Sequence, residues 1–115
     1  MKKVYYLSTC STCKRIMDDL NLSNFEQQDI KTTAITADQL EQMKEMSGSY
    51  ESLFSRKAMK FRSMGLNEMT LEEKDYRKYI LDEYTFLKRP VFIIDDQIFV
   101  GNSKKVVEEL KALLN

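Results

Sequence analysis

The β-prone stretches of this chain lie near its two ends, with a long region of helical periodicity between them. Residues 4 to 7 form a short apolar run after a charged start. Residues 91 to 101, "VFIIDDQIFVG", contain two β-branched and aromatic runs around a polar Asp95-Asp96-Gln97 turn, which is the pattern of a β-hairpin. We therefore expect strands from both ends of the chain to join one sheet.

The first predicted strand is followed by a helix and then by a second strand. Apolar residues recur at helical spacing after residue 13, and Ser11 or Thr12 is available as the N-cap. Residues 24 to 30 alternate weakly between polar and apolar side chains, as a strand does. Residues 3 to 30 are thus a βα unit that leads into another strand.

Residues 36 to 87 are predicted to be a continuous helical block. Thr36 with Gln39 forms a capping box, and Gly48 can end the helix that it opens. Such capping residues mark the helix boundaries better than the apolar spacing alone.

The rest of the block follows the same pattern. Over residues 50 to 61, apolar side chains recur every three or four residues, which is the spacing of a helix. An interruption of this helix is considered at Ser55. A second capping box, Thr70 with Glu73, is expected to open another helix.

The chain ends in a predicted amphipathic helix that Asn102 or Ser103 caps. Its apolar side carries Val106, Val107, Leu110, Leu113 and Leu114. The order is then β-α-β, helical block, β-β-α, without repeats or linkers. At 115 residues, we expect a single α/β domain that covers residues 1 to 115.

Charge and hydropathy exclude several classes of partner. Eighteen basic side chains balance eighteen acidic ones, so no global field attracts the chain to nucleic acid or to an anionic membrane. The N-terminal apolar run is too short for a signal peptide, and no segment is apolar enough to span a bilayer. We expect a cytoplasmic protein with no direct contact to nucleic acid or membrane.

The two cysteines of the chain, Cys10 and Cys13, lie in "CSTCKR" at the expected turn from strand to helix. A C-x-x-C beside such a pattern is typical of a thioredoxin-like redox motif. At the helix N-terminus, backbone N–H groups favour the Cys10 thiolate, and Lys14 and Arg15 add positive charge. Cys10 is the predicted nucleophile, and Cys13, one turn further on the same face, is the predicted resolving thiol.

Three other interpretations of the cysteine pair stay open. A metal site needs more ligands than one chain without histidine offers, although a second chain or carboxylates can supply them. A structural disulfide is unfavourable in a reducing compartment and would close a very small loop. Two inert buried thiols are the simplest alternative. We expect no bound metal and no bound cofactor.

Arg89-Pro90 contains the only proline of the chain and precedes a predicted buried strand. A cis peptide bond there would be a specific structural device. An ordinary proline at the start of a strand is the alternative.

Three stretches together resemble the arsenate reductase family linked to glutaredoxin, which includes the Spx-type transcription regulators. They are "CSTCKR", "LFSRKAMKFRSMGL" (residues 53 to 66) and "KRPVFIIDDQIFVG" (residues 88 to 101). The resemblance implies a thioredoxin-like fold with a four-stranded mixed sheet and a helical insertion at residues 36 to 87. It also implies a cis-proline at Pro90.

The same resemblance implies a set of site residues. Cys10 matches the nucleophilic cysteine, and Arg56 and Arg89 match arginines that hold an oxyanion against it. Permanently charged, planar guanidinium groups suit that task, because an oxyanion beside a thiolate is a like-charge encounter. Ser11, Thr12 and Lys14, which follow the nucleophile in the sequence, and Pro90 complete the predicted substrate-binding residues.

The implied reaction is attack of the Cys10 thiolate on arsenate, or on another oxyanion or disulfide, followed by reduction of the adduct by a second thiol. Glutathione with glutaredoxin is the reductant that the resemblance implies. Cys13 offers an internal alternative. It would form a disulfide with Cys10, and thioredoxin or glutaredoxin would then reduce that disulfide.

Two departures from the family pattern qualify this hypothesis. Asn102 stands where the related reductases have a third arginine, which weakens the case for arsenate as the substrate. Cys13 matches the Spx-type regulators and not the reductases. The alternative function is therefore a redox-sensing regulator that binds the RNA polymerase α subunit through a Cys10-Cys13 switch.

Overall fold

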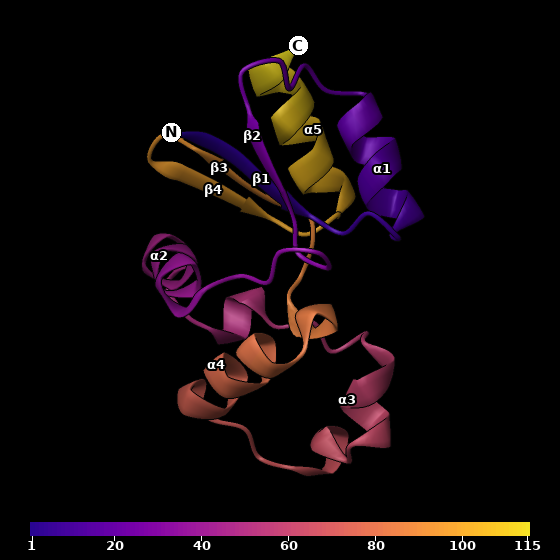
Figure 1. The fold of residues 1–115 in the computed structure, drawn as a ribbon, viewed down its shortest axis with the longest axis vertical. Coiled ribbons are helices and arrows are strands. Elements are labelled where there is room, and N and C mark those ends of the chain that lie inside the picture. The colour runs from indigo at the N-terminus through magenta and orange to yellow at the C-terminus, as the bar shows by residue number, and fades with distance from the viewer. The chain divides into compact units, whose positions relative to one another are not determined.

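The computed structural model describes all 115 residues, which form two compact units (Figure 1). Residues 1–34 and 89–115 make up the first, which we call the sheet unit. Residues 35–88 make up the second, which we call the helical unit. The helical unit contains the predicted insertion, residues 36 to 87.

The sheet unit contains four strands and two helices. In chain order they are β1 (Lys2–Tyr6), α1 (Ser11–Asp18), β2 (Glu26–Asp29), β3 (Val91–Ile94), β4 (Gln97–Val100) and α5 (Lys104–Leu114). The strands lie in the order β2-β1-β3-β4, with β1 parallel to β2 and the other neighbours antiparallel. This arrangement confirms the predicted thioredoxin-like, four-stranded mixed sheet.

One face of the sheet is buried against α1 and α5. Val4 of β1 lies opposite Phe92 of β3 in the ladder, and the two belong to one apolar cluster with Ile16 of α1 and Leu110 of α5. Both helices lie on the same side of the sheet (Figure 1). Because successive strand residues point to opposite faces, the alternate positions of β1 determine this packing.

The C-terminal hairpin has the predicted antiparallel form. Ile94 of β3 pairs with Gln97 of β4, so the turn consists of Asp95 and Asp96 alone and Gln97 belongs to the strand. Asp95 adopts φ 56°, a conformation that Asp tolerates better than most residues. The N-terminal ammonium lies 3.0 Å from the Asp95 carboxylate and ties the start of the chain to this turn.

The final helix begins as predicted, with one correction on its apolar side. Ser103 is the N-cap and accepts a hydrogen bond from the Val106 N–H at 3.2 Å. Leu110 is fully buried, whereas Leu113 is 48% exposed. At 100° per residue Leu113 lies toward the edge of the apolar stripe, so only the centre of the stripe reaches the core.

The helical unit is made of short helices. They are α2 (Ala37–Ser47), η1 (Glu51–Leu53), α3 (Met59–Ser63), η2 (Leu66–Glu68), α4 (Glu73–Asp82) and η3 (Tyr84–Phe86), of which the η elements are 3₁₀-helices. The predicted block is therefore helical in composition but not continuous.

Phe54 explains where the block breaks, and the interruption allowed for at Ser55 is real. The Phe54 ring lies 5.1 Å from the Phe86 ring and 5.0 Å from the Tyr76 ring, measured between centroids. Its backbone is extended and forms an isolated antiparallel bridge with Leu87. Burying this ring among other aromatic side chains therefore takes precedence over continuing the helix.

The two predicted capping boxes of the helical unit have different outcomes. Thr36 and Gln39 cap α2 reciprocally at 3.0 and 3.1 Å, as predicted, and Gly48 ends it at φ 100°. The predicted Thr70–Glu73 box is wrong, because the N-cap of α4 is Glu72, paired with Asp75.

Glu73 has a different task, which gives the physical reason for that correction. Its carboxylate accepts hydrogen bonds from the Tyr50 and Glu51 N–H groups at 2.7 and 3.0 Å. Those N–H groups lie at the start of η1, where no helical partner is available. Glu73 therefore caps another helix rather than its own.

The two threonines provide a direct test of this capping assignment. Replacing Thr36 with alanine leaves the Gln39 N–H without its acceptor and is expected to lower the free energy of unfolding by about 1 kcal/mol. Thr70→Ala is the matched control, since Thr70 is exposed and its side chain caps nothing, so its expected effect is within about 0.5 kcal/mol of zero. Urea unfolding of both variants measures the difference, and equal losses would contradict the assignment.

None of the helices is both long enough and apolar enough to cross a lipid bilayer.

Candidate active site

Cys10 lies at the point where β1 passes into α1. The Cys10 N–H donates to the Leu7 carbonyl at 3.0 Å, and the Cys10 carbonyl accepts from the Lys14 N–H at 3.2 Å. These two bonds close the turn and start the helix, so the N-cap of α1 is Cys10 and not Ser11 or Thr12 as predicted. The cysteine itself therefore stands where the free N–H groups of the helix begin.

The pKa of the Cys10 thiol is lowered from its ordinary value. Partial burial alone would raise it, but four nearby groups outweigh the burial by stabilising the thiolate. In decreasing order these are the Cys13 N–H, the Cys13 S–H, the Arg89 guanidinium and the Thr12 N–H. Cys10 therefore has the surroundings of a reactive thiol.

Cys13 has the opposite character. It is fully buried, and this burial, together with the neighbouring Cys10 sulfur, raises the pKa of its thiol to about 11. The pair thus consists of a partly exposed Cys10 that ionises more readily than an ordinary thiol and a buried Cys13 that keeps its proton near neutral pH and donates to the Cys10 sulfur. The two thiols are not bridged, and no group of three or more His, Cys, Asp or Glu residues is arranged to hold a metal ion.

Arg89 and Pro90 directly precede β3, and the charge of Arg89 acts on both cysteines. The Arg89-Pro90 peptide bond is cis, which confirms the prediction. Pro90 is buried, and its carbonyl accepts from the Gly101 N–H at 3.0 Å, which fixes this turn to the end of β4. The Arg89 guanidinium is close enough to both sulfurs to favour their thiolate forms.

Neutralising Arg89 tests its electrostatic role. Arg89→Gln is expected to raise the pKa of Cys10 and to slow its alkylation several-fold below neutral pH, because a positive charge beside the thiolate is lost. Arg77→Gln, at an exposed position of α4, is the matched control and should leave the profile unchanged. If the pH dependence of Cys10 alkylation is the same in Arg89→Gln as in the wild type, Arg89 does not act on the Cys10 thiolate.

Asp29, at the end of β2, was missed by the sequence analysis. Its Oδ1 accepts hydrogen bonds from the Ser8 N–H at 3.2 Å and the Lys31 N–H at 3.1 Å. The Ser8 hydroxyl also bonds this carboxylate, and these contacts lower the pKa of Asp29. Asp29 thereby holds the turn that presents Cys10. The only sequence signal was its place at the end of a predicted strand.

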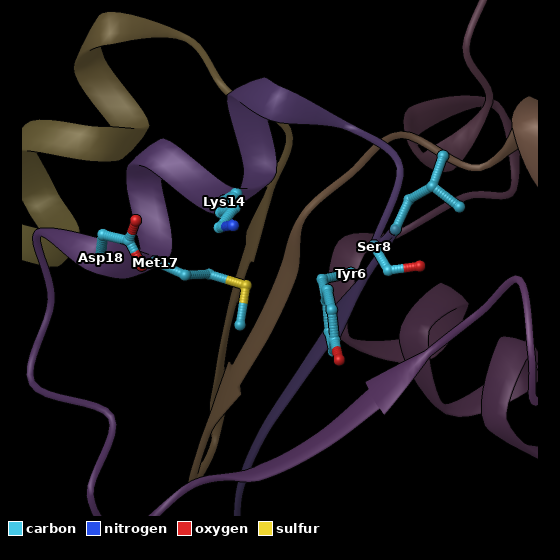
Figure 2. Close-up of a pocket in the computed structure, with 6 residues that line it drawn as sticks. Tyr6, Ser8, Lys14, Met17 and Asp18 are labelled. Atoms are coloured by element: carbon cyan, nitrogen blue, oxygen red, sulfur yellow. The ribbon is translucent and has the colours of Figure 1, made fainter.

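A pocket of about 260 Å³ lies beside α1 (Figure 2), and we call it the Lys14 pocket. Its lining comes from the end of β1 and from one side of α1: Tyr6, Leu7, Ser8, Lys14, Met17 and Asp18. Of the predicted substrate-binding residues, Lys14 is the one that lines it. Ser11 is exposed and Thr12 half-buried in the first turn of the helix.

Arg56 lies in the helical unit, where its own contacts are well defined. Its guanidinium donates to the Glu51 carboxylate at 2.8 Å and to the Tyr76 hydroxyl at 2.9 Å. The hydrogen bond to Glu51 raises the pKa of Arg56. Its role at Cys10 stays a prediction. Asn102, in the sheet unit, is exposed and directly precedes the Ser103 N-cap.

Comparison with known proteins gives matches over nearly the whole chain. The sequence profile of the ArsC family matches residues 5–110. Among curated proteins, no sequence matches at a significant level.

Several solved structures share the fold. The arsenate reductase from Vibrio cholerae has a TM-score of 0.74 at 17% identity, with 95% of this chain and 96% of that chain covered. An arsenate reductase related protein from Brucella melitensis has a TM-score of 0.72 at 21% identity, covering 94% and 92%. A Staphylococcus aureus protein, SACOL0876, has a TM-score of 0.75 at 23% identity, covering 96% and 98%.

These likenesses establish the fold, and the profile match runs from the end of β1 into α5. The cysteine turn, the cis-proline turn and the helical unit between them occur in the order that the resemblance implied. The chain is a member of the ArsC family.

Proposed function

We propose that the protein is a thiol-dependent oxidoreductase of the arsenate reductase type, with Cys10 as nucleophile and Cys13 as resolving thiol. The observation that carries the proposal is the inequality of the two sulfurs. Cys10 is partly exposed with a lowered pKa, whereas Cys13 is buried with a pKa of about 11. A reactive thiolate beside a protonated partner is the arrangement that thiol–disulfide chemistry needs.

With arsenate as substrate, the first step forms a bond between sulfur and arsenic. The Cys10 thiolate attacks arsenic, and one arsenate oxygen leaves as water after taking up two protons. Arsenic is still pentavalent in the adduct. Arg89 supports this step, because its positive charge offsets the repulsion between the thiolate and the anion. Arg56 is proposed as a second oxyanion ligand. To bind the anion, its guanidinium would give up the hydrogen bond to the Glu51 carboxylate.

The second step reduces arsenic. The Cys13 sulfur attacks the Cys10 sulfur, the sulfur–arsenic bond breaks, and its electron pair remains on arsenic, which leaves as arsenite. Cys13 loses its proton in this step, and a Cys10-Cys13 disulfide forms. An external thiol, either thioredoxin or glutathione with glutaredoxin, then restores both thiols. A disulfide substrate would follow the same two attacks, with a thiolate as leaving group.

Turnover by the wild-type protein tests the proposal. Arsenate reduction is measured with thioredoxin and its reductase, and separately with glutathione and glutaredoxin, against a protein-free control. The proposal predicts turnover above that control with at least one reductant. If neither system reduces arsenate nor a small disulfide, the enzymatic proposal is wrong.

One observation favours a second candidate, a redox-sensing regulator of the Spx type. The Cys13 S–H already donates to the Cys10 sulfur, so an internal disulfide needs little movement, as a switch does. This candidate predicts that the protein binds the C-terminal domain of the RNA polymerase α subunit in only one of its redox states. Pull-down with reduced and oxidised protein tests it, and absence of binding in both states would exclude it.

A further inference from the structure

The sheet has two edge strands, β2 and β4, and they differ in how they are protected. β2 (Glu26–Asp29) begins and ends with an acidic residue, whereas β4 (Gln97–Val100) contains neither a charged residue nor a proline. Charged side chains and prolines are the usual means by which an edge strand avoids pairing with another chain. β4, which forms one edge of the sheet (Figure 1), lacks both.

The backbone of β4 has free hydrogen-bonding groups on its outer side. The Gly101 N–H donates to the Pro90 carbonyl at 3.0 Å, so residue 101 faces β3. Because this direction alternates along an antiparallel strand, Ile98 and Val100 direct their N–H and C=O groups away from β3. Neither residue donates or accepts a backbone hydrogen bond outside the hairpin. The outer edge of β4 thus presents donors and acceptors that have no partner.

The order of these groups makes β4 complementary to itself. Two copies of β4 can lie antiparallel with Phe99 of one copy opposite Phe99 of the other, so that each Ile98 lies opposite a Val100. In this register every outward N–H of one strand meets an outward C=O of the other, as in an ordinary antiparallel ladder. The two copies are then related by a two-fold axis, which is the commonest symmetry of protein dimers.

The side chains on both faces of the sheet match in the same register. Phe99 belongs to the apolar cluster that α1 and α5 cover. Ile98 and Val100 are half-buried and lie on the opposite face, because successive strand residues alternate. Cross-strand pairs of aromatic and β-branched side chains stabilise a sheet. Pairing through β4 would therefore continue each face of the sheet from one copy into the next.

The charges that flank β4 are also complementary. Asp96 lies in the hairpin turn before the strand, and Lys104 and Lys105 follow the strand at the start of α5. All three side chains are exposed, and none of them forms an ion pair within its own chain. The antiparallel arrangement brings the turn of one copy to the start of α5 of the other. Acidic and basic side chains would then meet at both ends of the paired strands.

We propose that the protein forms a two-fold symmetric dimer through β4, in which the two four-stranded sheets join into one continuous sheet. The corresponding pairing of β2 would set Glu26 against Asp29 of the second copy, and like charges directly opposite each other are destabilising. β4 is therefore the edge that pairs. The inference does not depend on the proposed function, because neither cysteine takes part in the interface.

The oligomeric state of the protein tests the proposal. Sedimentation equilibrium is measured over a series of concentrations with a reducing agent present, so that no disulfide between copies contributes. For so short an interface the expected dissociation constant is on the order of 100 μM, so the protein should be mostly dimeric at about 1 mM. A protein that is still monomeric at that concentration would overturn the proposal.

Hydrogen exchange of single amides shows which surface pairs. The Ile98 and Val100 amides should exchange several-fold more slowly in concentrated than in dilute protein, because they are hydrogen-bonded only in the dimer. Ile30 donates to the Tyr6 carbonyl, so by the same alternation the Gln27 amide faces away from β1 at the opposite edge. It is the control and should keep its rate. A dimer in which the Ile98 and Val100 amides exchange as fast as in the monomer would overturn the proposal.

Charge reversal tests the complementarity across the interface. Asp96→Lys and Lys104→Glu are each expected to raise the dissociation constant about tenfold, because like charges then meet at both ends of the interface. The double variant Asp96→Lys/Lys104→Glu restores opposite charges and should return the constant to within about threefold of the wild-type value. Gln27→Lys, at an exposed position of β2, is the control and should leave the constant unchanged. A double variant that dimerises no better than the single variants would overturn the proposed pairing.

Discussion

Cys10→Ser lowers turnover of any oxyanion or disulfide substrate by roughly 10⁴-fold or more, the expected result when the nucleophile of a covalent mechanism is removed. A serine hydroxyl near neutral pH is almost entirely protonated. The Cys13 N–H and the Arg89 guanidinium are among the groups that stabilise the Cys10 thiolate. They would lower the pKa of a serine hydroxyl at this position far too little to make it a nucleophile. Steady-state reduction, measured beside the wild type with each reductant, checks this prediction.

Loss of folding would not explain such a result. Cys10 is the N-cap of α1, and serine is a better N-cap than most residues. Cys10→Ser is therefore expected to keep or slightly increase the free energy of unfolding, which urea denaturation measures. Substantial turnover by this variant would contradict the assignment of Cys10 as the nucleophile.

Cys13→Ser separates the formation of the adduct from its resolution. The serine hydroxyl can still donate to the Cys10 sulfur, so the first attack is expected to survive. No internal disulfide can form, and turnover supported by thioredoxin should fall by about 100-fold or more, because the second thiol of the exchange is missing. Mass spectrometry of the quenched reaction should then show a covalent adduct on Cys10.

Cys13→Ala is the companion variant, because it also removes the hydrogen-bond donor. It should raise the pKa of Cys10 relative to Cys13→Ser, since the S–H contact is one of the groups that lower it. Full thioredoxin-supported turnover in both variants would show that Cys13 is not the resolving thiol. The reductant would then have to attack the Cys10 adduct directly.

The architecture of the sheet unit follows from local sequence. Residues 4 to 7 and 91 to 101 have β-branched and aromatic runs, and the two-residue turn at Asp95 allows only a tight hairpin. The Ser103 and Thr36 caps were equally visible, because each side chain bonds an N–H group within its own turn. Patterns of this kind depend on neighbours in sequence, so the sequence alone suffices.

The wrong predictions concern positions whose structure depends on residues far away in the sequence. Glu73 has the spacing of a capping box with Thr70 but instead bonds the backbone of Tyr50 and Glu51. Phe54 leaves the helical pattern because its ring and backbone find partners at residues 86 and 87. No local pattern reports such long-range contacts.

The site shows the same division. Cys10 and Cys13 were identifiable from their spacing at a strand-to-helix turn, and the resemblance supplied Arg89. Asp29 was not identifiable, because its contact with Ser8 joins the ends of two parallel strands.

The central claim is that the two thiols of "CSTC" are unequal, and the pH dependence of their alkylation tests it most directly. Wild-type protein is treated briefly with iodoacetamide across the pH range, and mass spectrometry of peptides from Cys10→Ser, Cys13→Ser and wild type assigns the label. Cys10 is expected to react at a lower pH than an ordinary thiol does, whereas Cys13 stays unlabelled until the pH approaches about 11. Two thiols that ionise together in the ordinary range would contradict it.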